Sequence, residues 1–252
     1  MSGSPFPPPT VALHGPSMAS IIAAIPIAER MTGRQVIVIG GLAVLCRLST
    51  PYRATTDLDT VTRRQEGQVG QLELLLAAGS TPSGPAGAQV VTPLGFVQVD
   101  VLEVAETDLN PLPEDATDRL YVLAHAWAVD TAGMVSLVVD DRDPVEVLVA
   151  QPAALVAMKL QSAMNRGATK EATDLLDIIR LVTDPVTATA VMEGLQQADR
   201  QLRQDALLHG RHWFVDGMDL TLRKVRRLPE GAQMTIDDFR LVAGLLTAAL
   251  ES

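Results

Sequence analysis

The stretch Gln35-Val-Ile-Val-Ile-Gly-Gly-Leu-Ala-Val-Leu-Cys-Arg-Leu48 decides the fold. Its first half is a short run rich in β-branched residues that ends at Gly40 and Gly41, which is typical of a buried strand. Its second half is apolar and precedes Pro51, so we expect a helix that ends before this proline. The stretch therefore predicts a strand, a tight turn and a helix, in that order.

The segments around this unit predict further strands and helices. Residues 1–16 are rich in Pro, Gly and Ser, and we expect a flexible arm there. Short apolar stretches separated by turn residues predict further strands between 120 and 149. The remaining patterns predict a helix over 17–31, a strand over 55–61, a helix over 68–78 and a hairpin over 89–104.

From Pro152 onward the apolar spacing predicts helices alone. Because a strand-rich part precedes a helical part, we expect an α+β fold with a small mixed β-sheet, and not a doubly wound parallel sheet. The core is expected over 17–150 and a helical C-terminal region that closes the cleft over 151–252. The helices are expected at 152–166, 170–182, 186–208, 214–227 and 235–250.

Composition indicates a soluble protein of a reducing compartment. The one cysteine, Cys46, lies in an apolar run, which indicates a buried thiol and excludes an intramolecular disulfide. The N-terminus lacks the pattern of a secretory signal, and the apolar runs are shorter than the roughly 20 residues that span a bilayer. We expect a cytoplasmic protein without a membrane partner.

The formal net charge of −10 argues against indiscriminate nucleic-acid binding over the whole surface. Basic residues nevertheless crowd the C-terminal third. They form either an ordinary solvated helix face or a local strip that binds RNA. These residues are Arg200, Arg203, Arg211, Arg223, Lys224, Arg226 and Arg227.

Two carboxylates, Asp57 and Asp59, are the first candidates for chemistry. On a strand they point to the same face with Cα atoms about 6.5–7 Å apart, while Leu58 points to the core. Like charges side by side favour a cation between them, and Mg²⁺ prefers such oxygen ligands. A solvated strand or turn can carry the same pair, so the spacing alone leaves both interpretations open.

A third carboxylate, Asp100, lies in the apolar run Val97-Gln-Val-Asp-Val-Leu102, where an unpaired charge would be costly. Because Gln98 shares its strand parity, this face could simply be solvated. If the strand instead adjoins Asp57 and Asp59, three carboxylates converge and can hold two cations about 3.5–4 Å apart.

The glycines Gly40 and Gly41 are expected between a strand and a helix, where free backbone N–H groups can approach phosphate oxygens. Tight turns use the same residues, so the pair alone is unspecific. The chain contains neither a Walker loop nor a Rossmann glycine motif after a strand, and its four histidines form no HExxH motif.

The order of these motifs resembles the polymerase-beta-type nucleotidyltransferase superfamily, and within it the abortive-infection (AbiEii-like) nucleotidyltransferase toxins. The resemblance is carried by Val36-Ile-Val-Ile-Gly-Gly-Leu-Ala43, Arg53-Ala-Thr-Thr-Asp-Leu-Asp59 and Val99-Asp-Val-Leu102. A second family signature is similar at Lys159, Arg166, Lys170 and Asp174, with Glu171 where the family usually has Asp. The resemblance spans about residues 35–182.

The resemblance implies metal-dependent transfer of a nucleoside monophosphate from an NTP to an acceptor hydroxyl. It implies Mg²⁺ or Mn²⁺ on Asp57, Asp59 and Asp100, with Lys159 and Asp174 as further catalytic residues. A simple ion pair between Lys159 and Asp174 is the alternative, and Asp177 could be only a cap or surface acid. The nucleotide contacts that the resemblance implies are Gly40, Gly41, Arg53, Thr55, Lys159 and Arg166.

The resemblance favours the toxin of a toxin–antitoxin pair that acts on tRNA, with a cognate antitoxin as partner. A small-molecule nucleotidyltransferase of the antibiotic-modifying type is one alternative, and it would suit the acidic surface. A nucleotide-binding relative without catalysis is another, although the intact carboxylates and Lys159 count against it.

Overall fold

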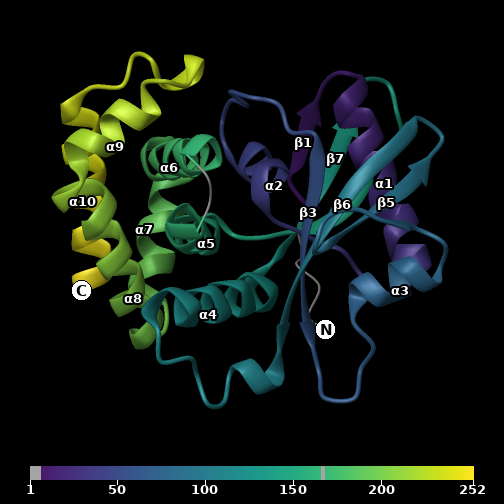
Figure 1. Cartoon of the computed structure of the whole chain (residues 1–252). Coiled ribbons are helices and arrows are strands. Elements are labelled where there is room, and N and C mark those ends of the chain that lie inside the picture. Colours follow the sequence, from purple (N-terminus) through teal and green to yellow (C-terminus); the bar gives the residue numbers. More distant parts are fainter. Residues whose placement is uncertain (1–6, 166–167) are drawn as a thin grey trace.

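The computed structural model describes residues 7–165 and 168–252, which form an eight-stranded mixed sheet with helices on both faces (Figure 1). The strands are β1 (Thr10–Leu13), β2 (Ile37–Val38), β3 (Asp57–Arg64), β4 (Thr81–Pro82), β5 (Gly87–Thr92), β6 (Gly95–Ala105), β7 (Gly133–Val139) and β8 (Val145–Val149). Across the sheet they follow the order β1-β7-β8-β2-β3-β6-β5-β4. The expected α+β fold, with a mixed sheet followed by a helical region, is confirmed.

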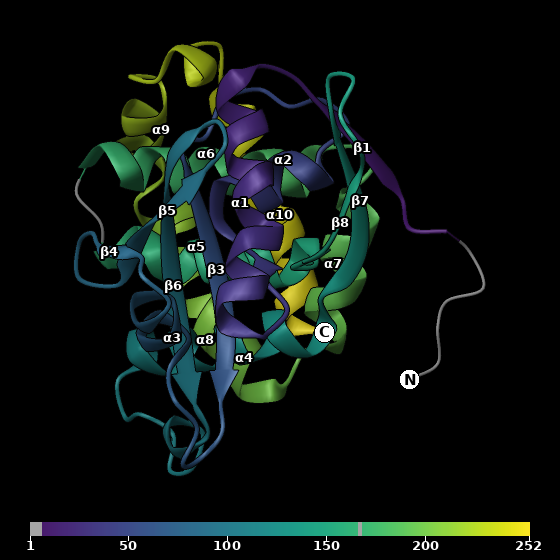
Figure 2. The same cartoon turned by 90° about the vertical axis from the view of Figure 1, so that its right-hand side faces the viewer.

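The helices form layers around this sheet. They are α1 (Pro16–Thr32), α2 (Gly40–Arg47), α3 (Gln71–Ala77), α4 (Ala116–Thr131), α5 (Pro152–Asn165), α6 (Ala168–Thr183), α7 (Ala188–Gln197), α8 (Arg200–Arg211), α9 (Met218–Val225) and α10 (Ile236–Glu251). Helices α1 and α3 cover one face, α2, α4, α5 and α6 lie on the other, and α8 to α10 form an outer layer (Figures 1 and 2). None of these helices has the length and apolar character of a membrane span.

Part of the N-terminal segment is structured, unlike the flexible arm expected over 1–16. Thr10–Leu13 form β1, which pairs in parallel with β7 at the edge of the sheet. The Ser136 amide donates a hydrogen bond to the Pro9 carbonyl at 2.9 Å and so extends this pairing. Helix α1 then begins at Pro16, whose missing N–H costs nothing in a first helical turn.

Helix α4 replaces strands that were expected between 120 and 149, and for this part the expectation is wrong. The helix packs against β3, α5 and α8, so apolar residues occupy several of its sides and hide the helical period. Asp115 caps it by accepting hydrogen bonds from the amides of Thr117 and Asp118. Strands β7 and β8 confirm the expectation for the remainder of this region.

The single helix expected over 186–208 is two helices, α7 and α8. Between them Asp199 accepts a hydrogen bond from the Gln201 amide at 2.7 Å and caps α8. Asp199 therefore marks the start of a separate helix inside the expected one.

Successive side chains of β6 point to opposite faces of the sheet, so one face of this strand contributes to the core and the other is polar. Val97, Val99 and Val101 are buried on the face covered by α1 and α3. Gln98 and Asp100 point to the opposite face, toward the side of α4 and α5. Residues of the sheet and of the helices on both of its faces belong to one large hydrophobic core. This packing fixes the position of the polar face of β6.

Candidate active site

Parallel pairing of β3 with β6 brings the three candidate carboxylates together. Asp59 and Asp100 are direct partners in this pairing, and Asp57 lies opposite Gln98 on the same face. Each carboxylate offers an oxygen within 4.8 Å of the other two, and all three residues are half-buried. Charges this close favour a cation between them, and a set of carboxylate oxygens suits Mg²⁺ or Mn²⁺.

Hydrogen bonds from neighbouring side chains orient two of these carboxylates. Thr55 Oγ1 donates to Asp57 Oδ1 at 3.0 Å, and Gln98 Nε2 donates to Asp100 Oδ1 at 2.6 Å. Gln98 Nε2 also donates to the Ser83 carbonyl at 3.1 Å. Gln98, whose polarity is also compatible with a solvated face, thus fixes the position of the Asp100 side chain.

Gly40 begins α2 in direct contact with Asp59. Its φ of +62° lies in the left-handed region, and a Cβ at this position would lie 1.9 Å from Asp59 Oδ2. No larger residue fits without displacing the carboxylate. The Ile39 amide donates to the Asp59 carbonyl at 3.0 Å, so the first turn of α2 presents its free N–H groups beside the carboxylates.

Gly41 packs against the segment that leads into β3. A Cβ on Gly41 would lie 2.9 Å from Thr55 Oγ1 and 3.1 Å from both terminal nitrogens of Arg53. Arg53 and Thr55 therefore lie at the N-terminal turn of α2, which places a guanidinium group next to its backbone amides.

Three side chains converge on Asp177 of α6. Arg53 donates to both of its carboxylate oxygens, at 3.1 and 2.8 Å, and Lys159 Nζ lies 2.8 Å from Asp177 Oδ2. The Tyr52 hydroxyl donates to Asp177 Oδ1. Asp177 is fully buried, and burial alone would raise its pKa, but Lys159 and Arg53 hold the pKa of this carboxyl below its ordinary value.

Lys159 is buried between two carboxylates. Its Nζ lies 2.5 Å from Asp174 Oδ1, and Ser162 Oγ donates to Asp174 Oδ2 at 2.8 Å. Burial would lower the pKa of Lys159, but Asp177 and Asp174 hold this pKa above its ordinary value, so the side chain is a cation at neutral pH. The ion pair considered from the sequence exists, with Asp177 as an additional member.

Most of the expected site residues line one pocket of about 370 Å³. Gly40 lines an adjoining pocket together with Asp59 and Lys159. Arg166 lies outside the described residues. Glu171, the departure from the family motif, pairs with Lys224 of α9. The expected residues that line the larger pocket are Gly41, Arg53, Thr55, Asp57, Asp59, Asp100, Lys159, Lys170 and Asp174.

Asp177 and Tyr52 are the site residues that sequence reasoning missed. Asp177 follows Asp174 by three residues and was interpreted as a cap or surface acid. Its neighbours Leu175 to Ile179 are otherwise apolar, and all of them are buried. An acid inside such a run is a signal of a buried ion pair, because an unpaired charge there would be costly. No pattern in the sequence around Tyr52 indicates its contact with Asp177.

The basic residues of the C-terminal third lie on α8 and α9 and in the turn after α9, and several have partners within the chain. Lys224 pairs with Glu171, and Arg211 pairs with Glu251. Arg203 donates to the Ser252 carbonyl. Part of the positive charge that could bind RNA is therefore already engaged in contacts within the chain.

Carboxylates on neighbouring strands beside a glycine turn that begins a helix are the arrangement that the resemblance to nucleotidyltransferases implies. A family model described as Nucleotidyl transferase AbiEii toxin, Type IV TA system, matches residues 32–240. Because this match covers most of the chain, the protein belongs to that family. The family implies an NTP substrate and a cognate antitoxin. No curated protein matches the chain.

Proposed function

We propose that the chain transfers a nucleoside monophosphate from an NTP to an acceptor hydroxyl. The observation that carries this proposal is the cluster of Asp57, Asp59 and Asp100, whose oxygens lie within 4.8 Å of one another beside the first turn of α2. The three carboxylates would hold Mg²⁺ or Mn²⁺. When bound, such ions neutralise phosphate charge and activate an attacking oxygen.

In the proposed reaction the acceptor oxygen forms a bond to the α-phosphorus. The bond between that phosphorus and the bridging oxygen of the β-phosphate breaks, and pyrophosphate leaves. Asp100 takes the proton of the acceptor hydroxyl, and the Gln98 amide holds its carboxylate in position. Positioning and charge neutralisation account for most of the catalysis in reactions of this kind.

The triphosphate would be bound by the first turn of α2 and by the cations around it. Gly40 and Gly41 supply free backbone N–H groups, and Arg53 and Lys159 supply positive charge that Asp177 holds in place. Arg166 remains a further candidate for the same role. Asp174 would keep Lys159 oriented through their ion pair.

An exposed aromatic residue supports a nucleic-acid acceptor, and we propose the 3′ end of a tRNA. Phe96 is 71% exposed and shares its strand parity with Asp100, which lies about 13 Å further along β6 at roughly 3.3 Å per residue. Its partner across the hairpin, Val91, is also exposed. An aromatic ring on this face suits stacking of an acceptor base, whereas a small-molecule acceptor would end short of it.

The test is incubation with each α-³²P-labelled NTP, Mg²⁺ and total tRNA. We expect label on tRNA with wild-type protein and with Asp141→Asn, an exposed control, and no label with Asp59→Asn. Label on aminoglycosides and not on tRNA would instead establish a small-molecule transferase. Absence of transfer to any acceptor, together with no binding of Mg·NTP by calorimetry, would overturn the proposal.

A further inference from the structure

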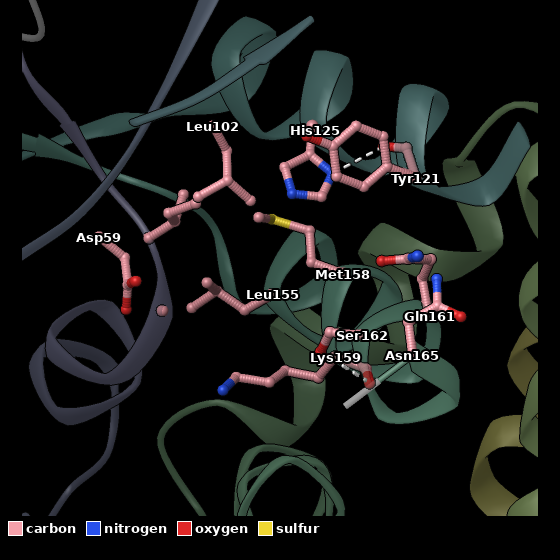
Figure 3. A pocket seen from close by; sticks show the side chains of 12 residues that line it. Asp59, Leu102, Tyr121, His125, Leu155, Met158, Lys159, Gln161, Ser162 and Asn165 are labelled. Carbon is pink, nitrogen blue, oxygen red and sulfur yellow. Dashed lines mark hydrogen bonds between the residues drawn. The ribbon is translucent and has the colours of Figure 1, made fainter. Parts of the chain in front are cut away.

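A second pocket of about 230 Å³ extends from Asp59 into an apolar space between β6, α4 and α5 (Figure 3). Nothing in the phosphate chemistry above uses this space. Its apolar and aromatic walls are Leu102 of β6, Tyr121 and His125 of α4, and Leu155 and Met158 of α5.

This pocket is continuous with the carboxylate pocket. Asp59, Leu102 and Lys159 line both. A nucleotide whose phosphates lie against Lys159 and the carboxylates can therefore extend its sugar and base into the second pocket. Figure 3 shows Asp59 at one side of this pocket and Gln161 and Asn165 at the other, with Met158 between them.

Two aromatic rings that pack against each other line this pocket. The ring centroids of Tyr121 and His125 lie 4.1 Å apart with an interplanar angle of 38°. His125 is buried, and its Nδ1 lies 2.7 Å from the Tyr121 carbonyl, which fixes the imidazole ring. Burial, followed by the charges of Asp108 and Glu103, raises the pKa of Tyr121, so this ring is neutral at pH 7. Such a surface suits stacking against a nucleobase.

Gln161 is a buried polar residue in the lining of this pocket. Its side chain is only 5% exposed, and its amide makes no hydrogen bond to any residue within the described ranges 7–165 and 168–252. A carboxamide offers two donor hydrogens and an acceptor oxygen, which are the groups that recognise the edge of a base. Among the described residues the Gln161 amide atoms do not belong to the fully buried polar atoms that lack a partner, so the carboxamide is open to the pocket, where the edge of a base can replace water.

We propose that this pocket binds the nucleobase of the NTP and that Gln161 determines which base is preferred. The inference rests on the proposed function and adds the location of base recognition. The base lies against the Tyr121–His125 ring pair, Leu102 and Met158 exclude water from its faces, and the Gln161 amide bonds its polar edge. Asn165, one helical turn from Gln161, is exposed at the mouth of the pocket.

The test is the Kd of each of the four Mg·NTPs, measured by calorimetry on the full chain. We expect wild-type protein to prefer one base, and Gln161→Leu to reduce that preference by roughly 5-fold to 100-fold. Gln161→Glu should shift the preference toward bases that present an amino group, because a carboxylate only accepts. Gln196→Leu, an exposed amide on α7, is the matched control and should keep the wild-type ratios.

The outcomes separate base recognition from the transfer reaction. Base-selective binding that changes in the Gln161 variants supports the pocket even if no acceptor receives label. Equal loss of affinity for all four NTPs, or unchanged ratios in both variants, would overturn the role of Gln161. Unchanged NTP binding with altered labelling of tRNA would show that the pocket takes the acceptor, and would also overturn the proposal. Tyr121→Leu tests the same pocket independently, with an expected loss of affinity for every NTP.

Discussion

The Arg53 guanidinium and the Asp177 carboxylate form a doubly hydrogen-bonded ion pair between the segment before β3 and helix α6. The two residues are 124 positions apart in the chain. Because Thr55 and Asp57 lie in the same short segment as Arg53, this ion pair fixes one end of the carboxylate cluster to the helix that carries Asp174. Thus the ion pair connects the sheet to the helical region at the site itself.

Loss of the Asp177 carboxylate should destabilise the protein strongly. In Asp177→Asn the guanidinium of Arg53 and the ammonium of Lys159 lose a buried anionic partner. We expect the free energy of unfolding to fall by about 3–5 kcal/mol, measured by urea denaturation. The control is Asp237→Asn, which breaks an exposed ion pair with Arg240 and should have a small effect. Equal stability of Asp177→Asn and wild type would contradict this prediction.

Protonation of Asp177 should contribute to the unfolding of the protein in acid. Burial alone would raise the pKa of this carboxyl, but Lys159 and Arg53 depress it below its ordinary value. A depressed folded-state pKa gives stability that is present above the ordinary value of about 3.9 and is lost as the pH falls through the lower folded value.

We therefore expect a decline of wild-type stability between about pH 5 and pH 2 that is shallower in Asp177→Asn. Urea denaturation at intervals of pH measures both curves. Parallel curves for the two proteins would show that the charge state of Asp177 is not linked to folding.

Substitution of Gly40 should remove activity without unfolding the protein. A methyl group at this position meets Asp59 Oδ2 and also requires a left-handed backbone. Displacement of the carboxylate by about 1 Å costs on the order of 100-fold in rate, so Gly40→Ala should lose at least that much transferase activity. Labelled transfer to tRNA measures the loss, and circular dichroism checks folding. Gly244→Ala in α10, where an added Cβ meets no atom within 4 Å, should remain active.

The thiol of Cys46 should be unreactive in the native protein. Cys46 lies on α2 and is 7% exposed, and burial raises its pKa to about 12 although Arg47 opposes this effect. At pH 8 a disulfide reagent should label the thiol only after unfolding, since the thiolate is the reactive species. The burial expected from the apolar run is confirmed. Complete labelling of folded protein within seconds would contradict the prediction.

The sequence predicted the parts of the fold and site that depend on local pattern. The period of two placed Asp57 and Asp59 on one face, and the strand–glycine–helix pattern placed Gly40 at the start of α2. The convergence of Asp100 on this pair depended on the parallel pairing of β3 with β6, which no local pattern specifies. The resemblance to a family supplied that relationship.

The features that the sequence did not predict depend on contacts between distant segments. The helical period of apolar residues in α4 is hidden because other elements cover several sides of this helix. Strand β1 forms because it can pair with β7 at the edge of the sheet. The role of Asp177 depends on Arg53 and Lys159, which approach it from other parts of the chain. The apolar run around Asp177 indicates a buried ion pair, but a single sequence does not show which distant residues complete it.

The close contact between Gly40 and Asp59 has a consequence at the level of the gene. Every single-base missense change in a glycine codon introduces a residue with a Cβ, and no such residue fits here. If bacteria that express this chain without an antitoxin are selected for survival, inactivating mutations should recur at codon 40. Substitutions at codon 40 would then be as frequent among the survivors as substitutions at the codons of Asp57, Asp59 and Asp100.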